Sequence, residues 1–223
     1  MKADRVAKSR DSLDRKFREG EAYLKRIVTG DEVWLHYYDP ELKRQSSVWK
    51  RTSDPTPVKP RTTKSAGKIM AVFFFDSEGV VYRYIVPRGQ TVNAQAYIEI
   101  LANLRDAVNK KRPHLRQTGW LLLHDNAPCH TAGKVLEFLA RNNIETVPHP
   151  PYSPDLAPSD FYLFPNLKRP LRGRHFQDDN DLLQAVGEVV RDLEKDGLLH
   201  VFHKWCERME KCVRIGGGYV EKE

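Results

Sequence analysis

The sequence contains few cysteines and no long hydrophobic run. Its three cysteines, Cys129, Cys206 and Cys212, have no Cys-x-x-Cys spacing, which is typical of reduced thiols in a cytosolic or nuclear protein. The longest apolar run covers only residues 69–75, whereas a membrane-spanning helix needs ~18 residues. No apolar stretch follows the charged first residues, so a secretory signal is not indicated. We therefore expect an intracellular protein that has no membrane partner.

The composition favours a folded, basic protein. Of the 223 residues, 40% are hydrophobic and 10% are aromatic, which is enough for the core of one ordinary domain, with or without an appended arm. The formal net charge is +7. This balance favours a polyanionic partner such as nucleic acid.

Hydrophobic patterns predict a sheet that is layered by helices. Strand patterns occupy residues 27–38, 69–75, 80–86, 120–123 and 144–147. Apolar residues recur at helical spacing around residues 97–108, 135–139, 161–167, 182–193 and 201–209. The second and third strands read as a hairpin, and Thr91 or Asn93 is the expected N-cap of the first of these helices. The order of elements indicates an α/β fold.

Two segments stand outside this pattern. Residues 1–26 carry nine basic and five acidic side chains and few apolar ones, so we expect an exposed helical linker arm ahead of a domain at 27–223. Residues 41–68 have no clear period and hold eight basic residues but only two acidic ones, with Trp49 in the middle. Loops of this length inside a compact domain are usually functional or disordered.

Three aspartates occupy positions suited to metal-dependent chemistry. Asp31 lies in the first strand, Asp125 ends the fourth, and Asp160 falls in the first turn of the helix that Pro158 begins. Two-metal phosphodiester chemistry needs carboxylates from separate elements around cations ~3.5–4 Å apart, and Mg²⁺ prefers such oxygen ligands. Each aspartate alone also fits a turn or a helix cap.

Other acidic and metal-ligating residues are weaker candidates. Glu32 should point to the opposite face of the strand from Asp31, and Asp155 precedes the expected helix start. Histidines and cysteines near Asp125 lack the paired spacing of a structural zinc site. His124 and His130 flank Asp125, where they could orient it, contact DNA or simply pack.

Two longer motifs surround these aspartates and identify a family. Residues 124–132 (HDNAPCHTA) and 152–160 (YSPDLAPSD) resemble the signature blocks of mariner-type transposases of the Tc1/mariner superfamily. The 34 residues between Asp125 and Asp160 match the spacing of the mariner DD34D triad. Residues 27–32 (IVTGDE) resemble the block that holds the first catalytic aspartate of that family.

The resemblance covers nearly the whole chain and has specific implications. It implies an RNase H-like (retroviral integrase-like) fold, a mixed five-stranded sheet flanked by helices, in which Asp31, Asp125 and Asp160 are catalytic and hold two Mg²⁺ ions, for which Mn²⁺ can substitute. It further implies hydrolysis at transposon ends, strand transfer into target DNA at TA sites, a homodimer on double-stranded DNA, and a place in the nucleus.

The sequence also departs from the family pattern. The N-terminal helix-turn-helix units that mariner transposases use to bind their terminal repeats do not precede residue 27. Proteins that fuse a SET methyltransferase to a mariner transposase are similar too, but in the best-known fusion asparagine replaces the third aspartate, which is intact here as Asp160. Two alternatives remain: a domesticated or decayed relative that binds DNA without transposing, and an RNA-cleaving ribonuclease H, which should lack both motifs.

Two basic runs are the predicted DNA contacts. The loop at 41–68 resembles the clamp that reaches the partner subunit in mariner transposases, and the second run follows Asp160 directly. A solvated surface is the alternative for both runs. The predicted contacts are Lys43, Arg44, Lys50, Arg51, Lys59, Arg61, Lys64, Lys168, Arg169, Arg172 and Arg174.

Overall fold

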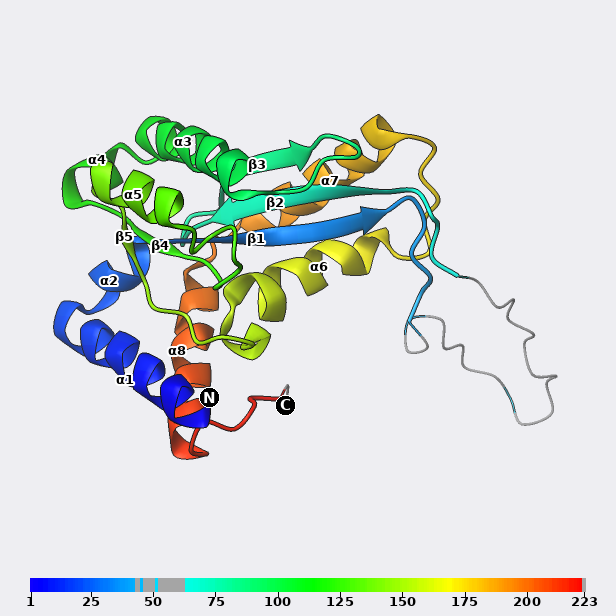
Figure 1. Ribbon diagram of the computed structural model, residues 1–223. Coiled ribbons are helices and arrows are strands. Elements are labelled where there is room, and N and C mark those ends of the chain that lie inside the picture. Colours follow the sequence, from blue (N-terminus) through cyan, green and yellow to red (C-terminus); the bar gives the residue numbers. More distant parts are fainter. Residues whose placement is uncertain (43–44, 46–50, 52–62, 222–223) are drawn as a thin grey trace.

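The structure is a computed structural model that describes residues 1–42, 45, 51 and 63–221. In this part of the chain, one mixed sheet of five strands has the order β3-β2-β1-β4-β5 (Figure 1). The central strand, β1, pairs antiparallel with β2 and parallel with β4. At the two edges, β3 pairs antiparallel with β2, and β5 pairs parallel with β4. The strands are β1 (Ile27–His36), β2 (Lys68–Phe75), β3 (Val80–Val86), β4 (Leu121–Leu123) and β5 (Glu145–Thr146). Every predicted strand is confirmed.

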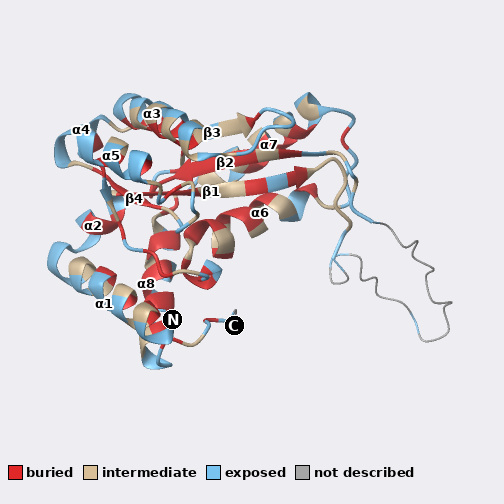
Figure 2. Ribbon diagram, in the orientation of Figure 1, coloured by how far each residue is buried: buried red, intermediate tan, exposed pale blue. Residues whose placement is uncertain are grey.

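Helices cover both faces of the sheet (Figures 1 and 2). One layer consists of α3 (Ala94–Lys111), α4 (Pro113–Thr118) and α5 (Gly133–Arg141). The other consists of α1 (Lys2–Glu19), α2 (Glu21–Lys25), α6 (Phe164–Lys168), α7 (Asp179–Glu194) and α8 (Leu199–Arg214). Because successive strand residues point to opposite faces, Phe73 and Phe75 pack under the second layer while Phe74 packs under the first.

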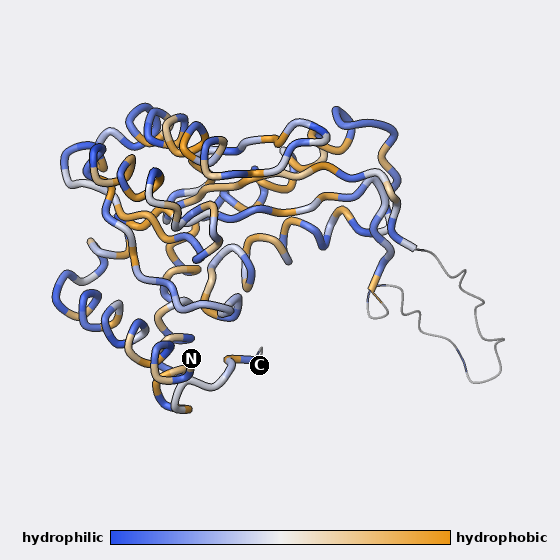
Figure 3. The backbone as a smooth tube through the Cα atoms, viewed as in Figure 1, coloured by the Kyte–Doolittle hydropathy of each residue, from blue (hydrophilic) through white to orange (hydrophobic). Residues whose placement is uncertain are grey.

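Strands β2 and β4 are hydrophobic on both faces because helices cover both faces of the sheet. All three residues of β4 are buried, as its continuous apolar run predicts. Figure 3 shows the hydrophobic residues concentrated along these strands. The Asn93 side chain accepts hydrogen bonds from the backbone N–H groups of Gln95 and Ala96, both at 3.0 Å, which confirms it as the cap of α3. The described helices include none that is long and apolar enough to cross a bilayer.

The N-terminal segment is helical as predicted, but the expectation that it is exposed is wrong. α1 packs along α8, and its buried face consists of Arg5, Ser9 and Ser12. Tyr23 and Leu24 of α2 are fully inside the core. The pattern misleads because small serines, rather than large apolar side chains, let the two helices approach. Phe17, one of the few apolar residues of this segment, is 89% exposed.

Candidate active site

The first aspartate stands on the central strand just beyond its pairing with β4. Parallel pairing of β1 and β4 ends at Thr29 opposite Leu123, and continuing this register by two residues places Asp31 beside Asp125. Glycine precedes Asp31 for a steric reason: a Cβ at Gly30 would lie 2.2 Å from Cδ1 of Phe74. The close approach of β2 at Gly30 thus fixes the backbone that carries Asp31.

The second aspartate lies in the loop that follows β4. Its Oδ1 accepts a hydrogen bond from the backbone N–H of Ala127 at 3.0 Å and is 2.6 Å from Nδ1 of His130. The hydrogen bond with His130 is the main cause that lowers the pKa of Asp125. Asp125 is therefore held ionised while its side chain remains about half exposed.

The third aspartate lies in an irregular helical turn. Pro158 precedes the π-helical turn η2 (Ser159–Leu163), which continues directly into α6. The N–H groups of Asp160 and Phe161 both donate to the carbonyl oxygen of Ala157 at 3.0 Å. The prediction that Asp160 lies in the first turn of a helix is confirmed, and π-helical turns are frequent at functional sites.

The three carboxylates line one cavity. This cavity has a volume of about 440 Å³, and its wall also includes residues 126–128 and 149–154. Asp31 comes from the sheet, Asp125 from the loop after β4 and Asp160 from the turn before α6. The structure thus brings together the three side chains that the sequence singles out.

Electrostatic repulsion inside this cavity favours a bound cation. Burial is the largest cause that raises the pKa of Asp31, and together with the charges of Glu32 and Asp160 it brings this pKa to about 8. Burial and the charge of Asp125 likewise raise the pKa of Asp160. Among the described residues, no three metal-ligating side chains already form a closed cluster. The donor set nevertheless fits hard divalent cations, since carboxylate oxygens are the ligands they prefer.

A buried histidine links Asp125 to a fourth carboxylate, that of Glu32, a contact that the sequence interpretation did not predict. His130 is 2% exposed, and its Nε2 lies 3.3 Å from Oε1 of Glu32. Burial lowers the pKa of His130, but the contacts with Asp125 and Glu32 outweigh this and raise it to about 10. The imidazolium therefore lies between two carboxylates and neutralises part of their charge.

Glu32 joins the site from the other side of the sheet. Asp31 shares its face with Val33, which packs under the α8 layer, so Glu32 points to the opposite face as predicted. Glu32 does not line the cavity, but His130 contacts it on that face. The sequence feature that could have indicated this contact is His130, which lies in the HDNAPCHTA motif five residues after Asp125.

His124 and Asp155 do not line the carboxylate cavity. His124 contacts the Tyr97 hydroxyl through Nδ1 at 2.8 Å, and burial, with help from His130, lowers its pKa to about 4. It is therefore neutral. Asp155 does not line the cavity, and Arg5 pairs with it instead.

Some of the predicted DNA contacts gather beside the site. Lys64 and Arg172 approach the Asp39 carboxylate at 3.7 and 3.8 Å. Lys168 is half-buried next to them, and burial, followed by the charge of Lys64, lowers its pKa. The charge of Asp160 also acts on the pKa of Lys168, so this basic group lies within electrostatic reach of that carboxylate.

The remaining predicted contacts are more dispersed or lie outside the described part of the chain. Arg51, Arg169 and Arg174 are exposed, and the Arg174 guanidinium stacks over the Phe176 ring. The predicted residues outside the described ranges are Lys43, Arg44, Lys50, Lys59 and Arg61.

Comparisons with known proteins agree with the motifs. A family model described as "Transposase (partial DDE domain)" matches residues 39–118. The chain is 37% identical over 202 residues to the mariner Mos1 transposase of Drosophila mauritiana, covering 90% of this chain and 58% of that protein. It is 30% identical over 206 residues to the human histone-lysine N-methyltransferase SETMAR, covering 90% of this chain and 29% of that protein. The chain thus spans little more than half of the first relative and under a third of the second.

Solved structures match almost the entire chain. The crystal structure of the Mos1 catalytic domain matches with a TM-score of 0.80 and 33% identity, covering 99% of this chain and 95% of that one. The Mos1 paired-end complex with Mn matches with a TM-score of 0.89 and 35% identity, covering 99% of this chain and 63% of that one. The predicted RNase H-like sheet is therefore confirmed.

Proposed function

The chain belongs to the mariner transposase family and matches its catalytic domain, and we propose that it cleaves DNA at transposon ends and joins the freed 3′-hydroxyl to target DNA, at TA sites. The observation that carries this proposal is the convergence of Asp31, Asp125 and Asp160, from three separate elements, on one cavity. Such convergence of carboxylates is what metal-assisted phosphodiester chemistry requires.

We propose two Mg²⁺ ions as the cofactors, with Mn²⁺ as a substitute. Mos1 structures have been solved with Mn and with Mg, which supports a divalent ion in this relative. When bound, such ions activate the attacking oxygen and stabilise the leaving one. Asp31, Asp125 and Asp160 would hold them.

The residues around the carboxylates then have defined tasks. His130 keeps Asp125 ionised and oriented through Nδ1. The rigid pairing of β1 with β2 holds Asp31 in place. Lys168, beside Asp160, would hold a phosphate of the DNA strand near the scissile bond.

The proposed partners are double-stranded DNA, as transposon end and as target, and a second copy of the chain. The structural relatives include a pre-cleavage Mos1 transpososome and a Mos1 strand transfer complex, which supports DNA as the substrate. A homodimer on DNA and a nuclear location follow from the same proposal.

A metal-dependent nicking assay on DNA and RNA duplexes tests the function. Asp31→Ala, Asp125→Ala and Asp160→Asn should each abolish cleavage of DNA, while Asp192→Asn should keep the wild-type rate, because Asp192 pairs with Lys195 on the surface. Cleavage of RNA alone would identify a ribonuclease H. Metal binding without DNA cleavage or joining would identify a domesticated or decayed relative.

A further inference from the structure

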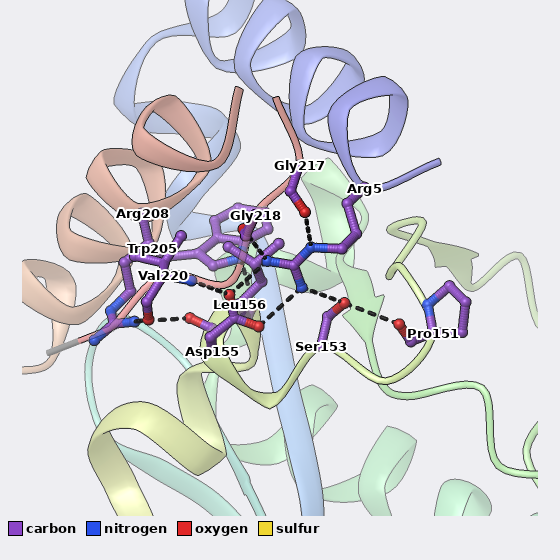
Figure 4. A network of polar contacts seen from close by, with 10 residues as sticks. All are labelled: Arg5, Pro151, Ser153, Asp155, Leu156, Trp205, Arg208, Gly217, Gly218 and Val220. Carbon is purple, nitrogen blue, oxygen red and sulfur yellow. Dashed lines mark hydrogen bonds and ion pairs between the residues drawn. The ribbon is translucent and has the colours of Figure 1, made fainter. Parts of the chain in front are cut away.

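A buried ion pair lies behind the wall of the carboxylate cavity (Figure 4). The Arg5 guanidinium of α1 donates to both carboxylate oxygens of Asp155, at 2.9 Å from Nη1 and 2.5 Å from Nη2. The two side chains are only 5% and 1% exposed. Bidentate geometry of this kind fixes orientation as well as distance.

The pair ties together parts of the chain that are far apart in sequence. Arg5 Nε donates to the carbonyl oxygen of Gly217 at 3.0 Å, and Nη2 donates to that of Gly218 at 2.9 Å. Asp155 Oδ2 accepts from the Val220 N–H at 2.8 Å. The start of α1, the segment after α8 and the segment before η2 therefore meet at one point, which we call the Arg5–Asp155 clasp.

The clasp also holds the cavity wall itself. Arg5 Nη1 donates to the Ser153 hydroxyl at 2.6 Å, and that hydroxyl donates to the Pro151 carbonyl oxygen at 2.9 Å. Tyr152, between them, has a φ of +51°, which lies in the left-handed region that non-glycine residues rarely adopt. Strained backbone of this kind persists only where its surroundings hold it.

The clasp is close to the third catalytic aspartate along the chain. Asp155 lies in the short 3₁₀ helix η1 (Pro154–Leu156), five residues before Asp160. The carbonyl oxygen of the next residue, Leu156, accepts a hydrogen bond from the Trp205 indole N–H at 2.9 Å, and Ala157 then accepts from the Asp160 N–H. Hydrogen bonds thus hold the segment between the two aspartates at Leu156 and at Ala157.

From this geometry we propose that Arg5 and Asp155 are positioning residues that fix Asp160 for metal binding, so that the site is competent only while α1 and the segment after α8 are docked. This inference rests on the proposed function, because it assumes that Asp160 is a metal ligand. It explains why a charged pair is retained in the interior, where replacement by apolar side chains often costs little stability.

Three variants and two controls test the clasp. Arg5→Met removes the guanidinium, Asp155→Asn removes the anion, and Arg5→Lys keeps the charge but loses the bidentate fork. Arg15→Met is the matched control, because Arg15 lies on the same helix and pairs with Glu145 away from this segment. Leu101→Ala, buried under the other face of the sheet, controls for loss of stability alone.

Two readouts separate positioning from stability. The first is hydrogen–deuterium exchange of the amides of residues 156–161 in metal-free protein, which should speed up in Arg5→Met and Asp155→Asn but not in Arg15→Met. The second is Mn²⁺ affinity by calorimetry at a temperature where every variant is folded. We expect the Mn²⁺ affinity to fall about 10- to 100-fold in Arg5→Met and Asp155→Asn, as for other residues that orient metal ligands. The affinity of Arg5→Lys should lie between that of these variants and that of the wild type.

The outcomes are distinct. Wild-type exchange and Mn²⁺ affinity in a folded Arg5→Met or Asp155→Asn would overturn the clasp, and so would equal losses in Leu101→Ala. If Arg5→Met does not fold, the exchange rate and Mn²⁺ affinity of Arg5→Lys test the clasp instead, and wild-type values of both would overturn it. If wild-type protein neither binds Mn²⁺ nor cleaves DNA, the proposed function fails, whereas the exchange measurement still reports whether Arg5 holds the segment before Asp160.

Discussion

The raised pKa of Asp31 predicts that metal binding and folding both depend on pH. Burial is the largest cause, followed by the charges of Glu32 and Asp160, and the pKa moves from its ordinary value of 3.8 to about 8. At neutral pH, metal-free protein therefore holds a proton on this carboxyl group. A cation can bind the carboxylate only when that proton leaves.

The sign and size of the effect follow from linkage. A carboxyl group whose pKa is raised on folding contributes most to stability at low pH, and this contribution is lost as the pH rises from about 4 to about 8. The interval spans about four pH units, each worth about 1.36 kcal/mol, so the loss is at most about 6 kcal/mol. Across the same interval, release of one proton should raise the apparent Mn²⁺ affinity by up to about tenfold per pH unit.

The assay is thermal unfolding at pH 5, 6, 7 and 8, with and without saturating Mn²⁺, for the wild type and for Asp31→Asn. Asparagine mimics the protonated carboxyl group, so the variant should lack the pH-dependent loss, and each 1 kcal/mol should appear as about 2–4 °C in a protein of this size. Mn²⁺ should restore most of the wild-type loss at pH 8. The reasoning is refuted if metal-free wild type and Asp31→Asn lose stability in parallel between pH 5 and pH 8.

Three further predictions concern the surroundings of the site. Gly30→Ala should destabilise the fold by about 1–3 kcal/mol through overpacking against Phe74, which urea unfolding measures; an unchanged midpoint would contradict it. His130→Gln should lower Mn²⁺ affinity about tenfold or more by removing the cation that orients Asp125, and unchanged calorimetry would rule this out. Lys168→Gln should reduce the slope of log binding constant against log salt for DNA by about one unit. An equal effect of the distant control Lys195→Gln would show that Lys168 makes no specific phosphate contact.

Much of the fold was predictable because its signals are local. The run at 69–75 and the turn residues 76–79 indicate a hairpin without reference to the rest of the chain. Asp125 could be placed because a fully apolar strand ends just before it, and Asp160 because proline at 158 marks a helix start. The family motifs then joined these separate positions into one site.

The parts that sequence reasoning missed depend on contacts between distant residues. The residues around Glu32 in the sequence do not indicate that the His130 side chain will contact it. Arg5 and Asp155 are 150 positions apart, and in the sequence Arg5 is one of nine basic residues in a segment that reads as a charged surface. Burial of a charged side chain is decided by whether a partner satisfies it, and the local pattern does not contain that partner.

The three aspartates that we propose as catalytic are held by supports of different rigidity, so they should differ in how easily they are displaced. Asp31 belongs to the central strand and is paired there with Phe73 of β2, so only a change in the core should displace it. Asp125 lies in a loop and depends on one buried imidazolium. Asp160 depends on a clasp that includes the first turn of α1 and the segment after α8, two segments that can open locally without unfolding the sheet. Undocking of either segment should therefore affect Asp160 first, weakening metal binding while the sheet and the other two aspartates remain in place.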